Sequence, residues 1–109
     1  MLESSIEKKC KKFIEKELGG KFKKLQGQGN AGDPDRLIVL NDGLVIFCEL
    51  KRRGQKPTEL QHRKMAQLKR RNHWVFWTDN YDDFAMRVQG IIHRWELKQL
   101  PSKVDFLYY

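Results

Sequence analysis

The stretch Asp33–Lys51, with the sequence DPDRLIVLNDGLVIFCELK, decides the fold of this 109-residue chain. Two apolar runs, Arg36–Leu40 and Leu44–Leu50, flank the turn residues Asn41-Asp42-Gly43. Short apolar runs on either side of an Asp-Gly turn are typical of a β-hairpin. We therefore predict a hairpin whose three-residue loop sets the register of both strands.

This register brings two acidic side chains together. Leu40 pairs with Leu44, and stepping outward along the ladder sets Asp35 opposite Glu49, with Lys51 pointing to the same face. Opposed side chains on antiparallel strands have Cβ atoms about 5 Å apart, where like charges destabilise the pair. Two carboxylates in that position therefore need a physical reason.

Both faces of the hairpin carry apolar side chains. The carboxylate face carries Leu37, Val39, Val45 and Phe47, and the opposite face carries Ile38, Leu40, Ile46 and Cys48. Strands that are apolar on both faces are typical of a sheet that is covered on both sides. We expect both faces to be buried.

Paired carboxylates at the edge of such a sheet are most simply neutralised by a hard divalent cation, and Mg²⁺ or Mn²⁺ suits oxygen ligands. With a lysine beside it, such a site suits phosphodiester hydrolysis, because the metal activates water while the ammonium orients the nucleophile or offsets negative charge. The alternative is structural. Asp35 would begin a strand after a proline turn, while Glu49 and Lys51 would form an ordinary ion pair at a solvated strand end.

The composition indicates one globular domain, residues 1–109, because the chain is too short for two independent cores. No apolar run reaches the length of a membrane span, and the N-terminus lacks the apolar core of a signal peptide. We expect an intracellular, cytoplasmic protein with no membrane contact. Cys10 and Cys48 fall in a predicted helix and a predicted buried strand, which favours core thiols over a disulfide.

The charge distribution favours a polyanionic partner. The formal net charge is +8 and the pI is near 9.7. Between Lys51 and Arg71, Glu59 is the single acid, and the basic residues are Lys51, Arg52, Arg53, Lys56, Arg63, Lys64, Lys69, Arg70 and Arg71. This run begins at the carboxylate pair, so it would draw substrate phosphates to that place. The alternative is a merely solvated helix face. The candidate nucleic-acid-binding residues are Lys51, Arg52, Arg53, Lys56, Arg63 and Lys64.

The rest of the chain predicts an α/β fold with a mixed sheet and helices on both faces. The elements expected around the hairpin are a helix over Ser4–Leu18, a strand over Phe22–Leu25, a helix from Pro57-Thr58 to Arg71, a strand over His73–Thr78 and a helix over Tyr81–Trp95. Thr58 and Gln61 match a capping box. The strand-helix-strand connection favours a parallel neighbour for the second hairpin strand. The apolar C-terminus, Val104–Tyr109, would form either an edge strand or part of a dimer contact.

The order Pro34-Asp35 and then Glu49-Leu50-Lys51 resembles the PD-(D/E)XK nuclease superfamily. The wider pattern is similar to its virus-type replication-repair nuclease branch, VRR-NUC. It includes the Gly-rich approach Gly29–Gly32 and the helix start Thr58–Gln61, and the resemblance covers roughly Ile6–Asn80. It implies a restriction-endonuclease-like core, in which a mixed central β-sheet is flanked by helices.

The resemblance also implies roles for the residues that match the family motif. Asp35 and Glu49 would bind Mg²⁺ or Mn²⁺, with the Leu50 carbonyl as a further ligand. Lys51 would act on the nucleophilic water or on the charge of the transition state. Asp33 stands where the family usually has a small residue or valine, and this third acid leaves the number of metal ions open.

Two further candidates come with the resemblance. Gln61 would support the site, and Glu7 would add an acid from the first helix, where Glu3 is its competitor. Each has a structural alternative, because Glu7 can close a capping box with Ser4 and Gln61 can close one with Thr58. The candidate catalytic residues are Glu7, Asp35, Glu49, Lys51 and Gln61.

The leading hypothesis is a metal-dependent DNA endonuclease that is structure-specific in the manner of a Holliday-junction resolvase. It would act on branched or duplex DNA in replication, recombination or repair. We expect a homodimer, since symmetrical cutting of two strands requires two sites related by a two-fold axis. The alternatives are a non-catalytic nucleic-acid-binding module and a small interaction subunit with a nuclease-like fold. The resemblance suggests a viral source, which would place the protein in the host cytoplasm.

Overall fold

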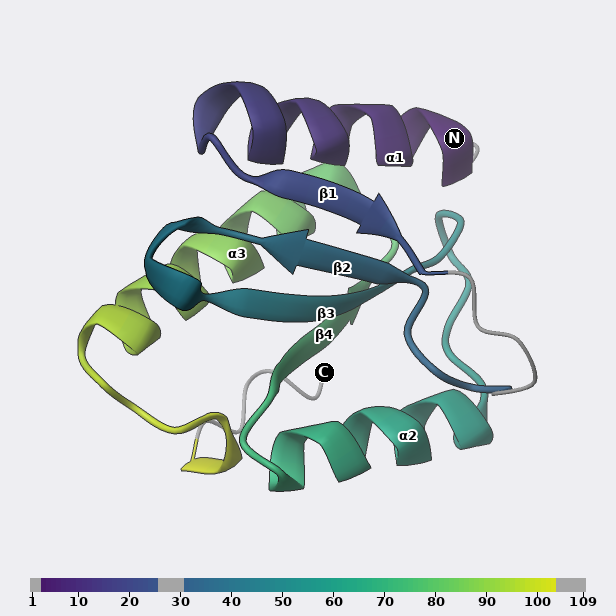
Figure 1. The fold of residues 1–109 in the computed structure, drawn as a ribbon. Coiled ribbons are helices and arrows are strands. Elements are labelled where there is room, and N and C mark those ends of the chain that lie inside the picture. Colours follow the sequence, from purple (N-terminus) through teal and green to yellow (C-terminus); the bar gives the residue numbers. More distant parts are fainter. Residues whose placement is uncertain (1–2, 26–30, 104–109) are drawn as a thin grey trace.

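The computed structural model describes residues 3–25 and 31–103, which form a four-stranded mixed sheet flanked by helices (Figure 1). The elements, in chain order, are α1 (Glu3–Lys12), a π-helical turn (Phe13–Glu17), β1 (Lys21–Lys24), β2 (Arg36–Val39), a 3-10 turn (Asn41–Gly43), β3 (Val45–Leu50), α2 (Glu59–Arg70), β4 (Trp74–Thr78), α3 (Tyr81–Glu96) and a 3-10 turn (Pro101–Lys103). The predicted α/β class is confirmed. The expectations for the C-terminal Val104–Tyr109 and for Gly29 and Asn30 of the Gly-rich approach lie outside the described residues.

The central hairpin of β2 and β3 has the predicted register. Val39 opposes Val45, and the Leu40 N–H donates to the Leu44 carbonyl over 2.8 Å, which closes the loop. Asp42 has a φ of 61° within this loop. Aspartate is among the residues that tolerate this left-handed conformation. The turn therefore fixes which residues face one another at the far end of both strands.

The sheet order is β1-β2-β3-β4, with β1, β2 and β3 antiparallel and β4 parallel to β3. The predicted parallel neighbour of β3 is thus β4, and α2 is the crossover helix between them. Because β3 and β4 run in the same direction, their C-terminal ends lie at the same edge of the sheet. The Lys51 N–H donates to the Thr78 carbonyl at this edge over 2.9 Å.

The main hydrophobic core lies between one sheet face and the pair α1 and α3. The fully buried side chains there include Ile6, Ile14, Ile38, Ile46, Phe76, Phe84 and Ile91. Phe84 meets Phe22 edge-on, with ring centroids 5.8 Å apart. Cys10 and Cys48 belong to this core as free thiols, as predicted. Burial raises the pKa of the Cys10 thiol to about 12.

The first helix ends differently from the single helix that was expected over Ser4–Leu18. Its last turn is π-helical, and the Leu18 N–H donates to the Phe13 carbonyl over 3.1 Å. The chain then passes close to the end of β2 at Gly20. A Cβ atom at this glycine would lie 2.5 Å from the Val39 carbonyl oxygen.

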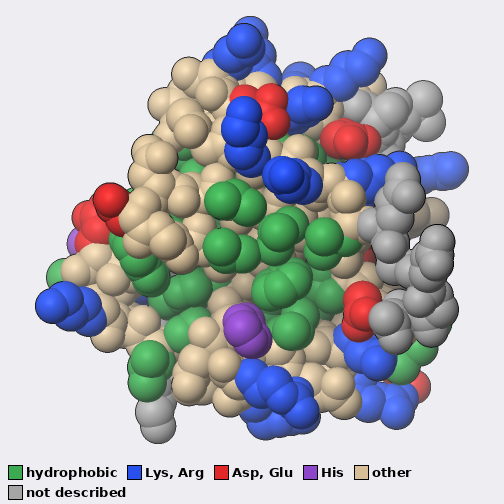
Figure 2. Space-filling model, in the orientation of Figure 1, with side chains coloured by type: hydrophobic (Ala, Val, Ile, Leu, Met, Phe, Trp, Pro, Cys, Tyr) green, Lys and Arg blue, Asp and Glu red, His purple; other side chains and the backbone are tan. Residues whose placement is uncertain are grey.

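The carboxylate face of the sheet is only partly covered, so the expectation that both faces are buried is wrong. Helix α2 packs against β4 at the edge of the sheet and leaves β2 and β3 without a helix on this side (Figure 1). Val45 is 38% exposed, and Leu37, Val39 and Phe47 are half-buried. Figure 2 shows apolar side chains gathered at the centre of this face, with lysines and arginines around them. The crossover helix returns directly to β4 and packs mainly against that strand, while its first turn reaches β3 through Gln61.

No helix in the described part of the chain is both long and apolar enough to cross a membrane.

Candidate active site

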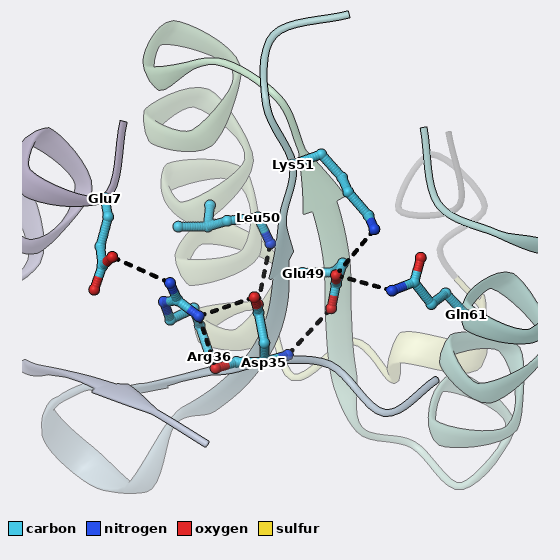
Figure 3. A network of polar contacts seen from close by, with 7 residues as sticks. All are labelled: Glu7, Asp35, Arg36, Glu49, Leu50, Lys51 and Gln61. Carbon is cyan, nitrogen blue, oxygen red and sulfur yellow. Dashed lines mark hydrogen bonds and ion pairs between the residues drawn. The ribbon is translucent and has the colours of Figure 1, made fainter. Parts of the chain in front are cut away.

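The hairpin brings Asp35 and Glu49 together at the open end of β2 and β3. The last ladder pair is Arg36 with Cys48, so one further step places Asp35 opposite Glu49, as predicted. The Asp35 N–H donates to Glu49 Oε1 over 3.2 Å, and the Leu50 N–H donates to Asp35 Oδ1 over 3.2 Å. Backbone amides of each strand therefore hold the carboxylate of the other (Figure 3).

Glu49 is the buried member of the pair, with 5% of its surface exposed. The pKa of its carboxyl is raised to about 7, first by burial and then by the charge of Asp35, and Lys51 opposes both effects. A carboxyl group in a desolvated position beside a second carboxylate resists ionisation. The cationic partners of the pair, Lys51 and Arg36, do not offset this cost fully, and a cation bound between the two carboxylates would relieve it.

Lys51 supplies one positive charge to this end of the sheet. Its Nζ lies 3.4 Å from Glu49 Oε2, and its side chain is 18% exposed. The residue directly follows β3, and its backbone is tied to β4. The ammonium group is therefore held beside the carboxylates and stays accessible from solvent.

Gln61 combines the two roles that the sequence presented as alternatives. Its side-chain oxygen accepts from the Thr58 N–H over 2.9 Å, and the Thr58 hydroxyl accepts from the Gln61 N–H, so the capping box is complete. The Gln61 Nε2 donates to Glu49 Oε2 over 3.1 Å. Because the cap uses the amide oxygen, the amide nitrogen is directed at the glutamate.

Glu7 is brought to the same end of the sheet, but it contacts an arginine and not the two acids. Its Oε2 lies 3.2 Å from Arg36 Nη2. Arg36 is 1% exposed, and its Nη1 lies 2.9 Å from Asp35 Oδ2 and 3.1 Å from the Asp35 carbonyl oxygen. The side chain of its competitor Glu3 lies outside the described residues.

Arg36 is the residue of this site that the sequence analysis missed. It occupies a position on the same face as Ile38, where the alternation of β2 requires a buried side chain. A charged residue at a buried strand position is rare unless it is paired. That conflict between charge and alternation is the signal that could have identified it.

The exposed acid Asp33 does not extend the carboxylate pair. In the described residues, no group of three or more His, Cys, Asp or Glu side chains is placed to hold a metal ion. The donors that fit a hard cation are the Asp35 and Glu49 carboxylates, with the Leu50 carbonyl oxygen as a predicted third. Oxygen donors of this kind suit Mg²⁺ or Mn²⁺.

Most of the candidate nucleic-acid-binding residues face solvent. Arg52, Arg53, Lys56 and Arg63 are exposed, and Lys64 is half-buried. The loop that carries the first three is tied to the end of β4, because the Gly54 N–H donates to Asp79 Oδ2 over 2.8 Å. Lys69, which belongs to the basic run but not to the candidate binding residues, is 2% exposed and does not contribute to the basic surface.

Two comparisons with known proteins identify relatives of this chain. No family model matches the sequence. The chain is 41% identical over 80 residues to the protein named "Putative nuclease p44" of Acyrthosiphon pisum secondary endosymbiont phage 1, with 73% of this chain and 85% of that protein aligned. A solved structure described as a "VRR_NUC domain" superposes with a TM-score of 0.72 and 28% identity, covering 80% of this chain and 94% of the other. The chain belongs to the VRR-NUC family.

Proposed function

We propose that this protein is a nuclease that hydrolyses phosphodiester bonds in DNA with the help of Mg²⁺ or Mn²⁺. The observation that carries the proposal is the meeting of two acids, Asp35 and Glu49, beside Lys51 at one edge of the sheet. Membership of the VRR-NUC family and the name of the phage relative support a nuclease.

Each side chain of the candidate site would have a separate role in this reaction. A bound divalent ion supplies Lewis-acid polarisation of the phosphate and a water of lowered pKa. Asp35 and Glu49 would hold that ion, and Gln61 keeps the Glu49 carboxylate in place through its amide nitrogen. The Lys51 ammonium, which lies 3.4 Å from Glu49 Oε2, would orient the nucleophilic water or offset negative charge that develops on the phosphate.

DNA is the proposed substrate because the positive charge is placed next to the acids. Arg52 and Arg53 follow Lys51 directly and are exposed, and the net charge of the chain is +8. Lysine and arginine neutralise backbone phosphates and release counterions, so binding should weaken steeply with salt. This contribution carries no sequence information, which is consistent with an enzyme that recognises the shape of DNA.

We further propose a homodimer that cuts branched DNA. Two sites related by a two-fold axis allow two strands to be cut symmetrically, and one chain holds one such site. The carboxylate face supports this proposal, because its centre is apolar (Figure 2) and Val45 on this face is 38% exposed. Contiguous exposed apolar surface is typical of protein interfaces. The junction specificity, the role in replication, recombination or repair and the cytoplasmic location stay predictions.

Cleavage assays on a panel of duplex, flap and four-way junction DNA test the proposal. The wild type should cut at least one substrate in Mg²⁺ or Mn²⁺, and not in the presence of a chelator. Asp35→Asn should abolish cleavage, and Lys51→Ala should reduce it by about a hundredfold or more, as expected when a transition-state donor is removed. Asp33→Asn, which removes an exposed acid from the same segment, is the matched control and should stay active.

Two outcomes would contradict the proposal. Cleavage that survives the chelator or the Asp35→Asn change would exclude a metal held by this pair. Salt-sensitive DNA binding without cleavage on any substrate, unchanged in Glu49→Gln, would instead favour the non-catalytic binding module.

A further inference from the structure

The charged side chains at the edge of the sheet lie in a row from α1 to α2. In Figure 3 the order is Glu7, Arg36, Asp35, Glu49 and then Lys51 beside Gln61. The signs alternate along this row except at one place. Asp35 and Glu49 are neighbours of like sign, and the hydrogen bond between them runs from a backbone N–H and not from a cationic group.

The guanidinium group of Arg36 lies between the carboxylates of Glu7 and Asp35. The Arg36 guanidinium reaches Glu7 Oε2 at 3.2 Å and Asp35 Oδ2 at 2.9 Å, and the side chain is 1% exposed. Arginine stays charged in proteins and holds carboxylates in a fixed fork geometry. A buried cation with two carboxylate partners is strongly held, because removing it leaves uncompensated charge.

Sites with two metal ions place those ions about 3.5–4 Å apart and need carboxylates on both. Here the acid that could serve a second ion is Glu7, and Arg36 stands between it and Asp35. No third acid, His or Cys joins the pair within the described residues. Among the described residues, the donors that remain suit one ion, held between Asp35 and Glu49.

Resting on the metal-dependent function proposed above, we propose that Arg36 takes the place of a second cation and that the site binds a single divalent ion. Arg36 is a positioning residue that fixes the Asp35 carboxylate, and Glu7 acts through Arg36 and does not ligate metal. One ion on the row of five charged side chains changes the net charge from −1 to +1, whereas two would leave +3. With one ion bound, the net charge of +1 is neutralised by the single negative charge of one substrate phosphate, and no further counter-ion is needed.

Counting bound Mn²⁺ tests this inference independently of cleavage. Electron paramagnetic resonance measures free Mn²⁺ during titration of the wild type, Glu7→Gln, Arg36→Met and the double variant Arg36→Met/Glu7→Gln. We expect one ion in the wild type and one in Glu7→Gln, whose affinity should fall by less than about tenfold, the lower limit for loss of a metal site's direct support. Arg36→Met should bind two ions, because Glu7 and Asp35 are then free to hold the second, and the double variant should return to one.

Circular dichroism and thermal melting establish which variants are folded before the counts are compared. Three results would each overturn the inference. The first is two bound ions in the wild type, and the second is an Mn²⁺ affinity that falls tenfold or more in Glu7→Gln. The third is a folded Arg36→Met that still binds one ion. If Arg36→Met does not fold, the wild-type count and the Glu7→Gln affinity decide alone. Failure of the proposed function is a different result, namely no ion bound by the folded wild type.

Discussion

The pKa of Glu49 predicts how the stability of the metal-free protein depends on pH. In the folded chain the carboxyl has a pKa of about 7, against 4.5 in the absence of burial. The folded state therefore keeps its proton over a pH range in which the unfolded state has lost it. Unfolding releases a proton there, so the free energy of unfolding falls as pH rises from about 4.5 to about 7 and is then constant.

The change in the free energy of unfolding follows from the difference between the folded and unfolded pKa values of Glu49. A difference between 4.5 and about 7 corresponds to roughly 3 kcal/mol over the whole range. Between about pH 5 and pH 7.5 the loss is roughly 2 kcal/mol, because the transition is incomplete at its lower end. Glu49 is 5% exposed, so solvent screening reduces these figures little.

Urea unfolding in the presence of a chelator measures the free energy at each pH. Glu49→Gln removes the titration, and the difference between wild type and this variant isolates it from all other ionisable groups. That difference should change by roughly 2 kcal/mol across the range, in the direction of a relatively less stable wild type at high pH. Asp33→Asn, which changes an exposed acid of the same charge, should track the wild type.

A pH-independent difference between wild type and Glu49→Gln would refute the reasoning, since it would show a carboxyl that ionises equally easily in both states. A difference that grows in the opposite direction would show that Lys51 and Gln61 outweigh burial and the charge of Asp35. Adding Mg²⁺ at about 100 times its dissociation constant should stabilise the wild type by about 2.7 kcal/mol at high pH.

Three further predictions concern the elements around the site. Gln61→Ala and Thr58→Ala each break the capping box and should lower the free energy of unfolding by about 1 kcal/mol in urea melts; equal cleavage rates in the two would contradict a contact role for Gln61. Val45→Lys, on the open sheet face, should shift the proposed dimer toward monomer in analytical ultracentrifugation with less than about 0.5 kcal/mol lost from the fold of the monomer. Gly20→Ala should lower the melting temperature more than Gly19→Ala, because a Cβ at Gly20 meets a backbone oxygen at 2.5 Å while a Cβ at Gly19 meets nothing within 4 Å. Only the strain of a φ of 71°, costing about 1 kcal/mol, opposes the change at Gly19.

The parts of the fold that the sequence predicted are those set by local rules. The turn at Asn41-Asp42-Gly43 fixes the register of its two strands, and through that register it places Asp35 opposite Glu49. The cap at Thr58 depends on a spacing of three residues and was equally visible. Such features need no knowledge of which surfaces pack together in the folded chain.

The features that were missed depend on distant segments. Arg36 donates to Glu7 on α1, which lies 29 positions earlier in the chain. This contact forms only when that helix packs on the sheet, so it could not be predicted from local sequence. The open face around Val45 follows from where α2 crosses, because apolar character alone cannot tell a covered strand from an uncovered one. Lys69 is buried although the two basic residues that follow it, Arg70 and Arg71, are exposed.

The fold and the candidate site share one set of contacts, and this has an energetic consequence. The backbone amides of Asp35 and Leu50 that end the hairpin also hold the two acids, and Gln61 joins the start of α2 to the buried one. Removing water from Glu49 costs stability in the metal-free chain, and the same burial strengthens every charge interaction with an ion bound there. A protein that carries a destabilising acid pair in an otherwise consistent fold has the pattern expected at a functional site, where local strain persists because ligand binding offsets it. With Mg²⁺ at about 100 times its dissociation constant, the stability regained should be comparable to the stability lost between about pH 4.5 and pH 7, and both effects should disappear in Glu49→Gln.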